Sequence, residues 1–507
     1  MIKSTQASEE DVLPLGFGLI GLVLAGSLWA CIGFIGEWAA IELGLLEEVA
    51  HRLFRVIGFG TAGLAFAALV HGLNRFPNWK KQAALGLGIY LPLAFITPRW
   101  FTYDTGLYHV PFINHLYQIG LEWNLGSLHS RYSFFNLLLY GQAALSRLAD
   151  SISLPSLNGI ILTGLLLILI NQVKSNWKQL APCLVVSGAL LLPTESTESF
   201  HSYNADFALG CIFLSCCVLI ANKKSSVKLS PYLLGVALFI PAIKISGLFL
   251  IPAILYAAVS RWGITSMRWQ AKPLAALLAV IVLTITVPGY ITSGHLFYPV
   301  AATGPLREGG ISKESALSES KISTIGWARF AYSGQIDELK PDAKPHEWLP
   351  KWAKSQNGRK MLSYLFLSIA TTFASLRLTR LQQWRPILIT TSLLWGLAIF
   401  VLPPDPRFYV GLTLTNLYCG TVWLANPDII GLHNSRKSAI ALFLVILLGI
   451  VIPSTWRPSG YRYGDFPEAN ESFSTVISDS GYKPRRGRSI TRSKSGTCWD
   501  LPAPCKP

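Results

Sequence analysis

Apolar runs of membrane-spanning length recur along almost the whole chain, and they constrain its fold more than any other feature. They fall at residues 13–36, 54–73, 82–98, 155–171, 179–193, 204–222, 231–243, 246–260, 273–291, 361–376, 386–402, 408–425 and 437–453. Strands of a membrane barrel would alternate polar and apolar residues, which these runs do not. About 20 residues are needed for each span, so the pattern predicts an all-α polytopic membrane protein with about 13 transmembrane helices. The shorter runs can be accommodated by tilt or by bilayer thinning.

Composition agrees with this class. Of 507 residues, 51% are hydrophobic and 14% are charged, whereas soluble proteins carry about 25% charged residues. The net charge of +16 comes from lysines and arginines in short connections between runs. That bias orients membrane helices, so we expect the lipid bilayer as a partner and no nucleic acid.

Charge also predicts the orientation of the chain. Every second connection is basic and nearly free of acids, as in Lys80-Lys81 and Lys223-Lys224. Such connections are cytoplasmic, which places the N-terminus inside and the C-terminus outside. The alternation requires that residues 134–148 do not span. They are predicted to form an amphipathic helix in the outer interface.

Asp104 follows the third run and lies among histidines and aromatic residues. A carboxylate at a helix exit is costly unless it binds or reacts with something. Tyr108, His109 and Arg131 share its loop and are candidate substrate-binding residues, because aromatic rings suit the apolar face of a sugar. The alternative is an aromatic belt with a few solvated polar groups.

Asp206 opens the run at 204–222, on the same predicted side as Asp104. Aspartate is also favoured at a helix start, so an N-cap is the alternative. Two carboxylates from separate loops can form a base with an orienting partner, or a divalent-metal site.

Two cations are predicted to lie on this outer side. Lys244 interrupts two apolar runs, and Arg407 ends the proline-rich turn Pro403–Arg407. Both suit a phosphate, arginine through its planar fork of donors. The alternatives are a lysine that extends to the interface and a local Asp405–Arg407 salt bridge.

Other motifs are weak. His109, His295 and His346 could bind a metal, but no HxxxH or HExxH spacing supports this. A divalent metal is therefore a candidate cofactor without a motif. Cys498 and Cys505 lie in a polar tail and could form a disulfide on an oxidising side.

Four short segments resemble the GT-C superfamily of integral-membrane glycosyltransferases, which includes protein O-mannosyltransferases and aminoarabinose transferases. They are Tyr103-Asp104 with Gly106–His109, the helix Arg131–Leu145, Asn204–Asp206, and Leu238–Gly247 with Lys244. The block Asp104–Phe135 also resembles uncharacterised bacterial multi-pass proteins related to that superfamily. One departure is that the acidic loop of the family usually follows the first span, whereas here two additional runs precede that span.

The resemblance implies a sugar donor linked to polyprenyl phosphate, used on the outer face of a bacterial plasma membrane. Asp104 would be the catalytic base, and Asp206 would assist it or help to hold a metal. Lys244 and Arg407 would hold the donor phosphate. The acceptor would be a lipid, a glycan or a protein.

The chain then divides into five parts. They are additional N-terminal helices (1–81), a GT-C-like core (82–291) with its first acidic outer loop (99–153), a large outer loop (292–360), C-terminal helices (361–453) and a loosely ordered tail (454–507). The alternative functions are a transporter or flippase, a ligase or polymerase of surface polysaccharide, and a purely structural membrane protein. A transporter would need polar groups near the bilayer midplane, where these runs have few.

Overall fold

The computed structural model describes most residues between 15 and 424 and four short segments of the tail. The described residues are 15–46, 48–50, 52, 54, 79–96, 100–101, 104–150, 156–175, 180–191, 203–222, 230–264, 271–330, 342–377, 379–424, 461–462, 474–476, 490–492 and 505–506. They are predominantly helical, as predicted.

Helices follow one another along the chain. The α-helices are α1 (Leu15–Glu42), α3 (Trp79–Ile96), α4 (Val110–Gln118), α5 (Leu137–Ala149), α6 (Leu157–Ser175), α7 (Leu180–Leu191), α8 (Ala205–Ala221), α9 (Ser230–Leu238), α10 (Ile240–Ile243), α11 (Ile251–Trp262), α13 (Ala271–Ser293), α14 (Lys313–Ser320), α15 (Trp327–Phe330), α16 (Pro345–Lys354), α17 (Gln356–Arg377), α18 (Arg385–Phe400) and α19 (Val410–Leu424). Two π-helices, η2 (Thr105–His109) and η10 (Lys321–Gly326), and the 3₁₀ helices η3 (Leu125–Ser127), η4 (Ser130–Ser133), η7 (Ile245–Leu250), η9 (Ala301–Thr303), η13 (Thr379–Trp384) and η14 (Pro406–Tyr409) join them.

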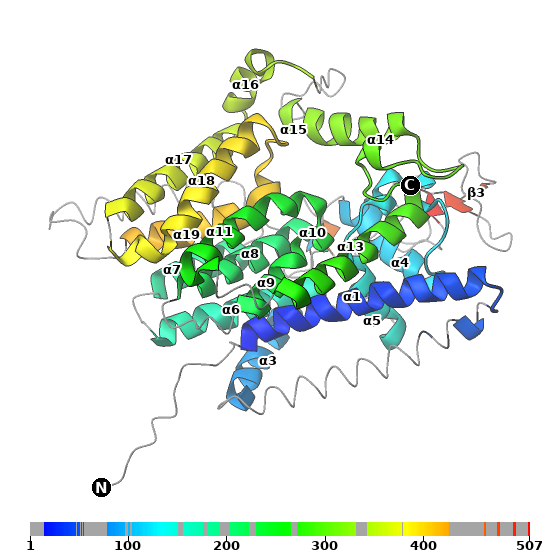
Figure 1. Ribbon diagram of the computed structural model, residues 1–507, viewed down its shortest axis with the longest axis horizontal. Helices are drawn as coiled ribbons and strands as arrows, with labels where there is room; N and C mark the ends of the chain where they lie inside the picture. Colours follow the sequence, from blue (N-terminus) through cyan, green and yellow to red (C-terminus); the bar gives the residue numbers. More distant parts are fainter. Residues whose placement is uncertain are drawn as a thin grey trace, which may run out of the picture.

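The core is a bundle around α8, all of whose residues are buried. Helix α8 packs against α6, α11 and α19, and α1 packs against α5 and α6. Most of the long helices run in a similar direction, and α4 and α14 lie at one end of the bundle (Figure 1). That end holds the loops in which the sequence placed the candidate site.

Three described helical segments are long and apolar enough to cross a membrane: Leu15–Glu42, Ile245–Trp262 and Ala271–Ser293. Each predicted run that the structure describes coincides with one or two helices. Two runs are not described: 437–453, and 54–73 apart from its first residue. The count of about 13 spans is nevertheless not supported. Segments such as α7 and α8, with 12 and 17 residues, are short for a crossing.

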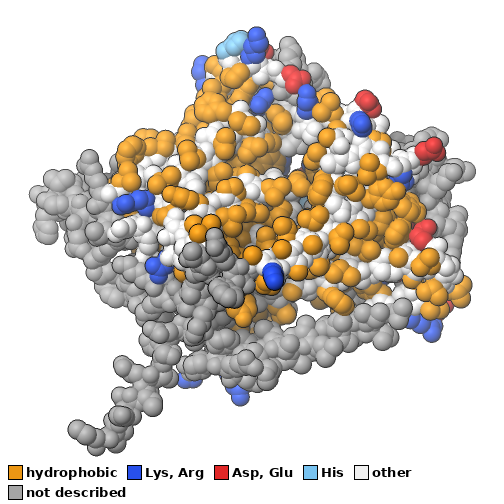
Figure 2. Space-filling model, viewed as in Figure 1, with side chains coloured by type: hydrophobic (Ala, Val, Ile, Leu, Met, Phe, Trp, Pro, Cys, Tyr) orange, Lys and Arg blue, Asp and Glu red, His pale blue; other side chains and the backbone are white. Residues whose placement is uncertain are grey.

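The described surface suits a membrane protein. Figure 2 shows hydrophobic side chains over most of one face, with charged side chains mainly towards its margins. Phe366 on α17, Leu393 on α18 and Leu283 on α13 are more than 60% exposed. Continuous exposed apolar surface of this kind marks a contact with lipid or protein.

Helix α5 corresponds to the predicted interfacial helix 134–148, and it is more buried than an interfacial helix needs to be. Nine of its residues are buried, because it packs between α1 and α4. Asn136 caps its start, accepting a hydrogen bond from the Leu138 amide at 3.1 Å.

Short strands lie outside the bundle. β1 (Trp100–Phe101) pairs antiparallel with β2 (Tyr461–Arg462), which brings part of the tail beside the loop that leads to Asp104. β3 (Ser474–Val476), β4 (Ile490–Arg492) and β5 (Cys505–Lys506) form a small sheet in the order β3-β4-β5. The remaining tail, with Cys498 and the predicted disulfide, lies outside the described residues.

Candidate functional site

One cavity of about 290 Å³ collects all the residues that the sequence singled out as site residues. Its lining comes from the first acidic loop, the start of α8, the break between α10 and η7, α13, the large loop, and the segment from the end of α18 to η14. The predicted site residues among the lining are Asp104, Tyr108, His109, Arg131, Asp206, Lys244 and Arg407. Their convergence is a property of the fold, and their individual roles remain predictions.

Asp206 and Lys244 form the tightest pair in the cavity. The Lys244 Nζ donates to both carboxylate oxygens of Asp206, at 2.8 and 2.7 Å. Lys244 has extended backbone between α10 and η7, and its side chain reaches Asp206 on α8. Because Asp206 is buried and accepts two hydrogen bonds from Lys244, it fixes the position and orientation of the ammonium group.

Asp206 is not the N-cap of α8, so that alternative is wrong. The cap of α8 is Asn204, whose side chain accepts the Asp206 amide at 2.8 Å. Asp206 lies in the first turn instead, where the helix dipole stabilises a negative charge. Its carboxylate is thereby available for Lys244.

Arg407 connects the other acids. Its Nη1 lies 3.6 Å from Asp104 and its Nε lies 3.2 Å from Asp405. The predicted Asp405–Arg407 salt bridge is therefore present, and Asp405 also accepts the Arg407 amide at 3.0 Å. The longer contact to Asp104 spans two distant parts of the chain.

Aromatic rings support both cations. The Lys244 Nζ lies 4.3 Å from the centroid of the Phe408 ring, and the Arg407 guanidinium lies 4.5 Å from the centroid of Trp327. An aromatic ring attracts a nearby cation, so these contacts stabilise the ammonium and guanidinium groups in their positions. Phe408 also lines the cavity, which gives it an apolar wall beside its charges.

Arg131 has a different environment. It forms an ion pair with Glu319 at 2.8 Å and lies 4.9 Å from the centroid of Phe134. Glu319 also accepts a hydrogen bond from Ser130 at 2.8 Å. This contact joins the first acidic loop to α14 in the large loop.

His109 is a buried polar group on the cavity wall. Burial lowers its pKa to about 4, partly offset by Asp104, while Lys244 and Arg131 lower it further. The imidazole is therefore neutral at pH 7. Its Nδ1 has no hydrogen-bond partner among the described residues.

Two serine hydroxyl groups that line the cavity also lack a hydrogen-bond partner among the described residues. The Oγ atoms of Ser133 and Ser246 are buried and make no hydrogen bond within the described part of the chain, and both residues line the cavity. A buried polar atom without a partner costs about 1–3 kcal/mol. A polar ligand in the cavity would relieve that cost.

His109, His295 and His346, which were considered as possible metal ligands, lie in different surroundings. His295 is buried, with Nε2 2.7 Å from the Ile311 carbonyl oxygen, whereas His346 is exposed beside Glu347. Within the described ranges, no group of three or more His, Cys, Asp or Glu side chains is placed to hold a metal ion.

Phe408, which lines the cavity, and two residues that contact its cations from outside the lining were not singled out from the sequence. Phe408 and Trp327 support the cations, and Glu319 fixes Arg131. Phe408 could have been found from its position next to Arg407. The other two lie in the large loop, where no motif distinguishes them.

A family model described as "Domain of unknown function (DUF8201)" matches residues 6–414. The chain belongs to this family. The DUF8201 match includes every charged residue of the cavity, from Asp104 to Arg407, and it excludes the tail with β2 to β5. No curated protein and no solved structure matches the chain.

Proposed function

We propose that this protein is a membrane glycosyltransferase of the GT-C type, which moves a sugar from a polyprenyl-phosphate-linked donor to an acceptor hydroxyl. One observation carries the proposal: Asp104, Asp206, Lys244 and Arg407, from four separate segments, line a single cavity with apolar and aromatic walls, together with Arg131. Residues 82–291 would form the GT-C-like core. Shorter helices around the three long apolar ones would complete a bundle of about 13 spans.

The charges suit transfer from a lipid phosphate. The acceptor oxygen attacks the anomeric carbon, and its proton passes to Asp104. The bond between that carbon and the phosphate oxygen breaks, and its electron pair leaves with the phosphate. Lys244 and Arg407 stabilise the charge that develops there, which is commonly the largest catalytic contribution. Inversion at the anomeric carbon follows from direct displacement.

The different surroundings of the two acids support different roles. Asp206 is held by Lys244, so it positions the cation. Asp104 is partly exposed and has the longer contact, so its oxygen can accept a proton. Donor phosphate would share Arg407 with Asp104 and weaken that contact.

The location of the site also fits a lipid substrate. A polyprenyl chain cannot easily leave the bilayer, so its phosphate must be met at the interface. The site residues lie at helix ends, and exposed apolar surfaces flank the bundle. By the charge alternation, this end would face outwards from a bacterial plasma membrane, with the N-terminus cytoplasmic and the C-terminus extracytoplasmic.

Hydrolysis of the donor tests the proposal without knowledge of the acceptor. The purified chain in lipid nanodiscs is mixed with polyprenyl-phosphate-linked sugars, and free sugar is measured. We expect Asp104→Asn to slow release by about 10²–10⁴-fold, the usual contribution of a general base, with donor binding retained. Release at the parental rate would contradict the assigned role.

Binding of undecaprenyl phosphate tests the cations separately. Lys244→Gln and Arg407→Gln should each weaken binding about tenfold or more, because each removes a charged hydrogen bond worth about 1.5–3 kcal/mol. Lys321→Gln is the matched control, since Lys321 pairs with Asp342 and does not line the cavity. Binding without any release of sugar from the donor panel would favour a flippase.

A further inference from the structure

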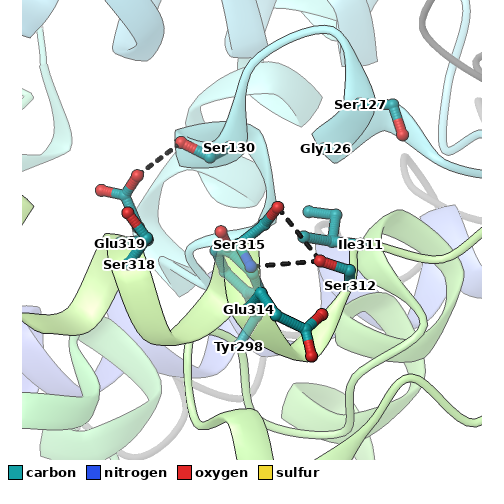
Figure 3. Close-up of a pocket in the computed structure, with 10 residues that line it drawn as sticks. All are labelled: Gly126, Ser127, Ser130, Tyr298, Ile311, Ser312, Glu314, Ser315, Ser318 and Glu319. Carbon is teal, nitrogen blue, oxygen red and sulfur yellow. Dashed lines mark hydrogen bonds between the residues drawn. The ribbon is translucent and has the colours of Figure 1, made fainter.

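A second cavity lies beside the first, and its chemistry is different. Its volume is about 610 Å³, and five serines contribute to its wall: Ser127, Ser130, Ser312, Ser315 and Ser318. Glu314 and Glu319 also line it, and no lysine or arginine is among its described lining residues. Figure 3 shows serines of the first acidic loop and of α14 on opposite sides of this space.

The lining favours an uncharged ligand rich in hydroxyl groups. Each serine hydroxyl is both a donor and an acceptor, and an ionised carboxylate accepts several hydrogen bonds. Hydrogen bonds from the Glu314 backbone and from Ser312 lower the pKa of Glu314, so its charge persists. An anionic ligand would meet the charge of Glu314, with no lysine or arginine in the described lining to bind it, which is unfavourable.

The two cavities share a wall. Tyr298 lines both of them. Glu319 of the second cavity bonds Arg131 of the first at 2.8 Å and Ser130 at 2.8 Å. Tyr298 and the Arg131–Glu319 ion pair therefore connect the linings of the two cavities.

One continuous helical segment runs along both cavities. Helix α14 supplies Ser315, Ser318 and Glu319 to the second cavity, and the π-helix η10 supplies Ser323 and Thr324 to the first. π-helical turns occur frequently at functional sites. This change of helix type falls where the lining passes from one cavity to the other.

We propose that the serine-lined cavity binds the acceptor, and that the acceptor is the uncharged, polyhydroxylated end of a glycan. This inference rests on the proposed function, in which the first cavity takes the phosphate of the donor. The division follows the charges: the cations lie in the first cavity, and hydroxyls and carboxylates line the second. An acceptor hydroxyl then reaches Asp104 past the Arg131–Glu319 pair.

Maltose is a suitable uncharged probe, and maltose 1-phosphate is its anionic counterpart. Binding of each to the full chain in nanodiscs is measured by saturation-transfer NMR, with sugar-based detergents removed. We expect maltose to bind more tightly than maltose 1-phosphate. Ser315→Trp should weaken maltose binding at least tenfold, because the indole occupies space that the disaccharide needs.

Leu317→Trp is the matched control. Leu317 is on the same helix and is exposed, but it does not line the cavity, so this variant should bind maltose like the parent. Thermal melting verifies that both variants are folded. Equal maltose binding by the parent and Ser315→Trp would overturn the inference, as would undetectable maltose binding by the parent or tighter binding of the phosphorylated sugar.

Undecaprenyl phosphate separates this inference from the proposed function. Its binding should be unchanged in Ser315→Trp, because Ser315 is not part of the first cavity. If the parent binds undecaprenyl phosphate but not maltose, only the acceptor assignment fails. If it binds maltose but not undecaprenyl phosphate, the donor assignment fails.

Discussion

At the scale of single residues, surroundings distinguish side chains of identical chemistry. The Asp206 side chain is 5% exposed and is fixed by Lys244, whereas that of Asp104 is 37% exposed and has a 3.6 Å contact with Arg407. A carboxylate that already accepts two short charged hydrogen bonds is poorly available as a base. Asp104 is thus the better candidate for proton transfer.

His109 links this site to stability through pH. Its pKa is about 4 in the folded protein and about 6.5 when unfolded. The unfolded state therefore binds more protons between these values, and stability falls as pH falls from about 6.5 to 4. The shift corresponds to about 3 kcal/mol lost across that window.

His109→Gln should flatten this dependence. Melting temperatures of the parent and the variant are compared at pH 7 and pH 4.5, and the variant should lose less on acidification. His129, whose pKa burial also lowers to about 4, accounts for part of the remaining slope. His346→Gln is the control because that side chain is 75% exposed, and an equal slope in all three proteins would contradict the prediction.

At the scale of elements, a buried ion pair joins α1 to α5. Arg147 donates to Glu37 at 2.6 Å, and to the carbonyl oxygens of Leu116 at 2.6 Å and Tyr117 at 2.9 Å. The Phe34 ring lies 4.7 Å from its guanidinium. One side chain therefore connects α1, α4 and α5, and it holds α5, which lies within the first acidic loop.

Arg147→Leu should destabilise the protein by about 3–5 kcal/mol, because it leaves the Glu37 carboxylate charged and buried. The double variant Glu37→Leu/Arg147→Leu should recover part of this loss. Denaturant or thermal unfolding measures both. Asp342→Asn is the control: it breaks the exposed pair with Lys321 and should cost less than about 1 kcal/mol. A similar small loss for Arg147→Leu would mean that the pair is not structurally important.

At the scale of the whole molecule, the exposed apolar surface implies a solvent other than water. Leu283 lies in the middle of α13 and is 61% exposed, and Leu306 in the large loop is 59% exposed. The two leucines have similar exposure in the isolated chain. Only Leu283 belongs to a helix that is apolar and long enough to span.

Leu283→Arg should therefore impair membrane insertion, since an arginine at the centre of a span costs about 2.5–3.5 kcal/mol. Leu306→Arg should have little effect. The fraction of each variant that fractionates with membranes and resists alkaline extraction measures the difference. Equal insertion of the two variants would show that the exposed face of α13 does not contact lipid.

The sequence by itself determined the helical class and the positions of the helices. Long apolar runs are a local property of the sequence, so they can be recognised without knowledge of the tertiary structure. It also identified charged residues at helix ends, where carboxylates and cations are costly without partners. Its count of about 13 spans is not supported, because only three helical segments among the described residues are long and apolar enough to cross a membrane.

Only the tertiary structure decided which charges meet. Asp206 and Lys244 are 38 positions apart, and Asp104 and Arg407 lie in segments separated by most of the chain. Such pairs depend on how the helices pack. Contacts between residues far apart in the sequence cannot be predicted from local sequence patterns. The same holds for Glu319 and the serine-lined cavity, which arise because α14 folds against the first acidic loop.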